Sequence, residues 1–76
     1  MVYSTAKLAK IMGVYAEFRI YLNRMERGNE TVANSAGAYG ALDDLKKMTS
    51  RALRRALGLP GLEKKLEKLD NAMASY

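Results

Sequence analysis

The stretch LAKIMGVYAEFRIYLNRM, residues 8–25, decides the fold class. Apart from Met12, the residues of its main apolar stripe recur at alternating steps of three and four, the spacing that returns side chains to one face of a helix. This stripe, called here the first seam, consists of Leu8, Ile11, Met12, Tyr15, Phe18, Leu22 and Met25. The opposite face, which we expect to contact solvent, carries Lys10, Glu17 and Arg24. The pattern predicts a helix over residues 4–27, with Ser4 or Thr5 as its N-cap and Gly28 just after its last turn.

The first predicted helix is apolar on more than one side. Val14 and Tyr21 flank the first seam, and Ile20 lies well outside it. Because one neighbouring helix would not cover all of these side chains, the helix requires more than one packing partner.

Residues 28–40 allow three interpretations. Asn29 could cap a helix that starts at Glu30, or a loop could run until a helix starts at about 35–38. Each interior glycine costs about 1 kcal/mol relative to alanine, which slightly favours the later start. In the third interpretation small residues form a smooth strip on this segment, where another helix can approach closely. The strip consists of Ala33, Gly37 and Ala41.

Two further helices are predicted after this segment. The second covers residues 38–57, with an alternative extension back to 30, and its expected buried face consists of Ala38, Ala41, Leu42, Leu45, Met48, Ala52 and Ala56. Gly58 ends this helix and Pro60 opens the next, over residues 60–75. The second seam, on that last helix, consists of Leu62, Leu66, Leu69, Met73 and Tyr76. The sequence therefore predicts an all-α fold, a small bundle of about three amphipathic helices.

The 76 residues contain no cysteine and no histidine. A chain this short needs regular packing, a disulfide, a metal or a partner, and disulfides and thiolate or imidazole metal sites are excluded. We expect a single helical domain over residues 1–76, with two alternatives: a fragment of a longer chain, or a domain completed by oligomerisation. The second seam favours these alternatives because it runs to Tyr76 with no C-cap.

No pattern in the sequence indicates catalysis. Histidine, the usual general base, is missing, and most carboxylates lie three or four residues from a lysine or arginine. Asp43 and Asp44 are adjacent, so on a helix their side chains point about 100° apart and do not form a catalytic pair. We expect these two aspartates to pair with Lys46 and Lys47. Neither a phosphate-binding nor a dinucleotide-binding glycine pattern occurs. The prediction is a non-enzyme with no cofactor, no metal and no small-molecule substrate.

The formal net charge of +5 comes from one block, since the other charges balance at eight positive and eight negative. The block consists of Lys46, Lys47, Arg51, Arg54 and Arg55. On one continuous helix it would form a basic ridge. The ridge is either a solvated face or a contact for nucleic-acid phosphates, an acidic protein or a lipid headgroup. No aromatic residue is interleaved with it and no helix-turn-helix spacing is evident, so base recognition is unsupported.

The leading hypothesis is a non-enzymatic helical protein–protein interaction or assembly module, whose partner is itself or another helical protein. Its expected helix-packing interface consists of Leu8, Ile11, Tyr15, Phe18, Leu22, Met25, Leu62, Leu66, Leu69, Met73 and Tyr76. The alternative is a small basic nucleic-acid-binding protein that contacts phosphates through residues 46–55. Membrane-surface attachment through the first helix is weaker, because Glu17 and Glu26 offset its basic residues. The lack of a signal peptide, a transmembrane segment and cysteine favours an intracellular location.

The alanine-rich second helix runs into the segment LGLPGLE, residues 57–63. This part, roughly a third of the chain, resembles helical segments of viral tail tape-measure proteins and carries no diagnostic motif. The resemblance implies a helical segment of a viral structural or tail-assembly protein.

Overall fold

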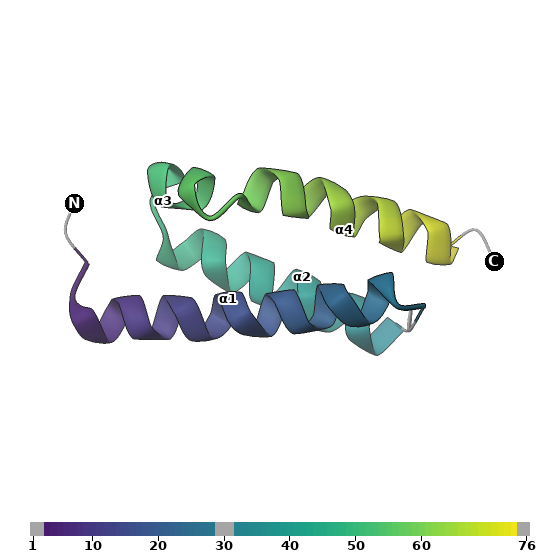
Figure 1. Cartoon of the computed structure of the whole chain (residues 1–76), viewed down its shortest axis with the longest axis horizontal. Helices are drawn as coiled ribbons and strands as arrows, with labels where there is room; N and C mark the ends of the chain where they lie inside the picture. Colours follow the sequence, from purple (N-terminus) through teal and green to yellow (C-terminus); the bar gives the residue numbers. More distant parts are fainter. Residues whose placement is uncertain (1–2, 29–31, 75–76) are drawn as a thin grey trace.

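The computed structural model describes residues 3–28 and 32–74, and every regular element in these ranges is an α-helix. The helices are α1 (Thr5–Glu26), α2 (Val32–Met48), α3 (Arg51–Ala56) and α4 (Leu59–Ala74). The three longer helices lie side by side, with α2 antiparallel to α1 and α4, and short α3 closes one end (Figure 1). The molecule is elongated, 44 × 18 × 17 Å. The predicted small all-α bundle is confirmed.

Helix α1 begins and ends where its capping residues predict. The Ser4 hydroxyl accepts a hydrogen bond of 3.1 Å from the Lys7 backbone N–H, which is the expected N-cap geometry. Gly28 follows the last turn with a φ of 93°, a left-handed conformation that glycine adopts without a steric penalty. The stripe and its caps together therefore placed both ends of the helix within one residue.

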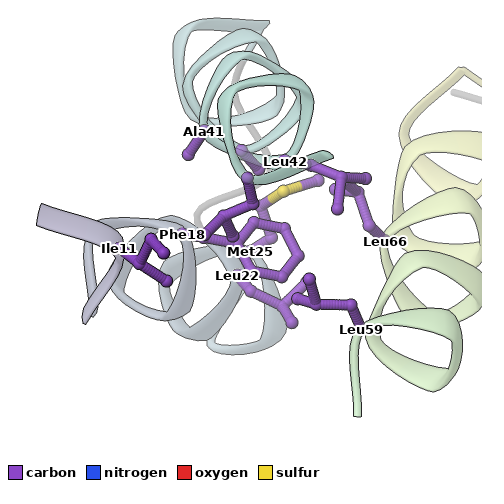
Figure 2. Packing of buried hydrophobic residues seen from close by; sticks show 10 residues of the cluster. Ile11, Phe18, Leu22, Met25, Ala41, Leu42, Leu59 and Leu66 are labelled. Atoms are coloured by element: carbon purple, nitrogen blue, oxygen red, sulfur yellow. The ribbon is translucent and has the colours of Figure 1, made fainter. Parts of the chain in front are cut away.

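The first seam supplies one wall of the core. Figure 2 shows four of its residues, Ile11, Phe18, Leu22 and Met25, packed with side chains from α2 and α4. The buried cluster consists of Ile11, Phe18, Leu22 and Met25 from α1, Ala38, Ala41, Leu42 and Leu45 from α2, and Leu59 and Leu66 from α4. Because α1 meets two helices at once, the expectation that it needs more than one packing partner is confirmed.

The structure also decides among the interpretations of residues 28–40. Helix α2 is already formed at Val32, earlier than 38 and within the alternative extension back to 30; the expected cap at Asn29 and start at Glu30 lie outside the described residues. Gly37 allows a close contact, but with a side chain and not with the backbone of another helix. A Cβ built on Gly37 would lie 2.6 Å from the ring of Tyr21. Ala41 is buried, whereas Ala33 is exposed and does not extend the strip.

Two glycines of α2 give a matched test of this contact. Gly40→Ala is expected to raise the free energy of unfolding by about 1 kcal/mol, since a Cβ there meets nothing within 4 Å and alanine is the better helix former. Gly37→Ala gains the same propensity but must displace the Tyr21 ring, so we expect a net loss of about 1 kcal/mol. Urea denaturation followed by far-UV circular dichroism measures both changes. Equal stabilisation by the two variants would contradict the packing of Tyr21 on Gly37.

The structure divides the predicted second helix, residues 38–57, into α2 and α3. Ser50 is extended, with φ −72° and ψ 162°, and its hydroxyl accepts a hydrogen bond from the Leu53 N–H as the N-cap of α3. Its own N–H donates to the Tyr3 hydroxyl at 2.6 Å, and this contact with Ser50 lowers the pKa of Tyr3. The backbone therefore leaves the helix where a side-chain cap and an external acceptor replace the helical hydrogen bonds.

This break changes the expected buried face. Ala38, Ala41, Leu42 and Leu45 are buried and Met48 is half-buried, as the spacing predicted. Ala52 and Ala56, assigned to the same face, are exposed because α3 leaves the axis of α2.

Helix α4 follows Gly58, whose φ of 71° makes the turn from α3. On its seam Leu66 is buried and Leu62 and Leu69 are half-buried, while the Met73 side chain and Tyr76 lie outside what the structure describes. Polar contacts join α4 to its neighbours: the Ser35 hydroxyl donates to Asp70 Oδ1 at 2.7 Å, and Lys65 Nζ lies 2.8 Å from Glu26 Oε1.

Candidate interaction surfaces

The side of α1 that faces away from the bundle carries a second apolar stripe. It is named here the outer face of α1 and consists of Ala9, Met12, Gly13, Ala16 and Ile20. At 100° per residue its centre lies opposite Phe18, the centre of the buried side. All five residues are exposed, and the two large ones, Met12 and Ile20, are 52% and 50% exposed. A scattered exposed apolar residue needs no explanation, but a stripe with helical spacing indicates a place for another helix.

Charged residues border the outer face of α1. Lys10 and Glu17 lie along one border, and neither forms an ion pair within residues 3–28 and 32–74. Arg19 and Leu8, which is 41% exposed, lie along the other border. A Cβ on Gly13 would meet nothing within 4 Å, so the surface is open and flat at this point.

Eight residues of the predicted helix-packing interface pack within this chain, while Leu8 is exposed and the Met73 side chain and Tyr76 lie outside the described part. Ile11, Phe18, Leu22, Met25 and Leu66 are buried within the chain, and Tyr15, Leu62 and Leu69 are half-buried against the same core. Met12, assigned to the first seam, belongs to the outer face. The spacing placed Ile20 outside the first seam, but the rest of this face was missed, although the seven-residue spacing of Ala9 and Ala16 was a usable signal.

The second surface is a hollow of about 380 Å³ at the end of the bundle closed by α3. It is named here the basic cleft and is lined by Leu42, Lys46, Arg51, Arg54, Arg55, Leu59, Pro60 and Glu63. These residues come from the C-terminal half of α2, from α3 and from the start of α4. The structure thus gathers four of the five residues of the predicted ridge around a concavity.

The break between α2 and α3 replaces the predicted straight ridge with separate contacts. Lys46 Nζ lies 2.5 Å from Glu63 Oε1, rather than near the aspartates of its own helix. Lys47 points elsewhere and pairs with Asp43 at 3.0 Å, as expected, and this hydrogen bond raises the pKa of Lys47. Both ion pairs are exposed enough that each contributes little to stability.

The Arg54 side chain forms hydrogen bonds with the backbone at the end of α2. Its Nη1 donates to the carbonyl oxygens of Lys46, at 2.7 Å, and Thr49, at 3.2 Å, where α2 ends. A helix C-terminus leaves carbonyls without partners, and a basic side chain satisfies them favourably. Arg54 therefore holds α3 against the end of α2.

Arg51 and Arg55 are the two exposed arginines of the cleft. No described residue forms an ion pair with either of them, whereas Lys46 pairs with Glu63. Their spacing of four places them on the same side of α3.

An acidic hollow of about 250 Å³ adjoins the basic cleft along α2 and α4 and includes Asp43, Glu63 and Glu67. Tyr39 lies at its edge, where burial, followed by the nearby charges of Asp70, Glu67 and Glu63, raises the pKa of this tyrosine. Lys46 lines both hollows, so the sign of the local charge changes across this side chain.

The described residues contain no group of three or more acidic side chains placed to hold a metal ion. Within the same ranges no helix combines the length and apolar character needed to cross a bilayer. Comparison with protein-family models, curated proteins and solved structures finds no match. The resemblance to tail tape-measure segments stays a prediction.

Proposed function

We propose that this chain is a non-enzymatic assembly module that pairs with a second copy of itself through the outer face of α1. The observation that carries the proposal is the exposure of Met12 and Ile20 within an otherwise small-residue stripe, on the side of α1 opposite the core. Burial of such a stripe against another helix removes apolar surface from water without disturbing the bundle.

Charge complementarity favours a second copy in antiparallel orientation. We place the two-fold axis between the two α1 helices, perpendicular to both, at the level between Gly13 and Val14. Residue i of one helix then lies opposite residue 27 − i of the other. The border that carries Lys10 and Glu17 lies next to the same border of the second copy. Lys10 of each copy therefore meets Glu17 of the other. Both charges lack an ion-pair partner within the described part of a single chain. A symmetric interface of this kind forms each favourable contact twice.

The small residues fit the same arrangement. In this register the Ala9 and Ala16 positions of the two helices alternate along the contact line, with Gly13 next to the axis. Small residues let helix backbones approach closely, so Met12 and Ile20 can pack beside them instead of holding the helices apart. On the other border the aliphatic part of Arg19 lies over Leu8 of the second copy and covers its exposed surface.

Charge reversal tests the pairing and its orientation together. Lys10→Glu and Glu17→Lys each convert two attractive contacts into repulsive ones, and each is expected to weaken the dimer about tenfold. The double variant restores the attraction with the signs exchanged and should return the dissociation constant to within about twofold of the original. Sedimentation equilibrium over a concentration series measures all four proteins.

A stable monomer at micromolar concentration would contradict self-pairing. Failure of the double variant to recover the affinity would contradict the antiparallel register. Recovery would have to come from contacts between the two copies, because residues seven apart in one helix are too distant to compensate each other within a chain.

A further inference from the structure

We infer that the basic cleft binds a small organic phosphate, with Arg51 and Arg55 as the phosphate ligands. The inference is independent of the proposed pairing, because the cleft is lined by α2, α3 and α4 and the pairing surface lies on α1.

The two arginines have the geometry and the freedom for this role. They project from the same side of α3 into the lining of the cleft, and no residue in the described ranges pairs with them. A guanidinium presents a planar fork of N–H donors that matches two phosphate oxygens at once. Arg54 holds α3, which carries both arginines, in place, since its guanidinium donates to backbone carbonyl oxygens at the end of α2.

The charge of the cleft matches a phosphate monoester better than a single carboxylate. Its lining holds Lys46, Arg51, Arg54 and Arg55 against Glu63, an excess of three positive charges. A phosphate monoester brings about −1.5 to −2 at neutral pH and neutralises most of this excess. The neighbouring acidic hollow repels an anion, which confines the phosphate to the α3 end.

The shape of the cleft calls for an organic group on the phosphate. Exposed Pro60 lines it beside the charged residues, and the buried side chains of Leu42 and Leu59 lie at its base. Its volume of about 380 Å³ lies within the usual range for small-molecule sites, about 300–1,000 Å³. The ring face of a flat group such as a nucleobase can pack there while its phosphate meets the arginines. The basic block suggested contact with phosphates, but a small-molecule site could not be predicted from it, because the concavity arises only from the break between α2 and α3.

Titration with adenosine monophosphate and with inorganic phosphate at low salt, followed by heteronuclear NMR and calorimetry, tests the site. We expect the nucleotide to bind more tightly than inorganic phosphate and to shift the signals of Arg51 and Arg55. The double variant Arg51→Gln/Arg55→Gln should weaken nucleotide binding at least about tenfold. Arg51→Lys/Arg55→Lys keeps both charges but loses the fork, and should weaken binding several-fold.

The matched control is Arg27→Gln/Lys68→Gln, which removes two exposed positive charges outside the cleft and should change nucleotide affinity less than about twofold. Equal affinity for the nucleotide and inorganic phosphate would overturn the inference, because the apolar lining would then have no role. No binding of the nucleotide at about 10 mM would overturn it as well. So would much tighter binding of a single-stranded oligonucleotide with a steep salt dependence, which would assign the surface to a nucleic-acid backbone.

Discussion

Phe18→Ala is expected to lower the free energy of unfolding by about 3–5 kcal/mol, the largest effect of any single truncation in this chain. Phe18 is fully buried at the centre of the first seam and is the largest of the fully buried side chains. Its removal leaves a cavity where α1 packs against α2 and α4. Since the whole stability of a domain this size is only a few kcal/mol, we expect the variant to be largely unfolded in water.

Val32→Ala is the matched control for this substitution. Val32 is 78% exposed at the start of α2, so its truncation should change stability by no more than about 0.5 kcal/mol. Both variants are measured by thermal and urea denaturation with far-UV circular dichroism. A cooperative Phe18→Ala unfolding transition close to that of the unaltered protein would show that the core does not depend on the first seam.

The accuracy of the sequence prediction for α1 has a physical cause. Large apolar residues, a serine cap and a terminal glycine all gave the same boundaries, so local and tertiary preferences agreed. The break at Ser50 was missed for the opposite reason. Ala52 and Ala56 continue the apolar spacing of α2, but alanine is also a good residue for an exposed helix, and its spacing alone does not show which side is buried.

The candidate surfaces were harder to predict than the fold. The basic block was visible from composition, but its division into ion-paired residues, a backbone-bound residue and residues with no ion pair in the described ranges depends on the position of Glu63 and on the end of α2. The outer face of α1 gave a weak signal because three of its five residues are alanine or glycine, which contribute little hydrophobicity. Met12 fitted the first seam by spacing, and only the packing of α1 against α2 and α4 shows that it faces outward.

Met12→Lys is expected to weaken self-association at least about a hundredfold, equivalent to about 2.7 kcal/mol. In the antiparallel register Met12 lies close to the two-fold axis and near Met12 of the second copy. One substitution therefore removes two apolar contacts and places two like charges beside each other, next to Arg19 on the same border. The fold of the single chain should persist, because Met12 is half-exposed and outside the core cluster.

The control variant Ala36→Lys adds the same charge at an exposed position of α2 and should leave the association unchanged within about twofold. Sedimentation equilibrium gives the association constant of each variant, and far-UV circular dichroism confirms that its helices are intact. Because Met12 supplies area at the centre of the proposed contact, its effect should exceed that of either charge reversal at the border. The reverse order, with Lys10→Glu more damaging than Met12→Lys, would mean that the copies meet through the charged border and not through the apolar stripe.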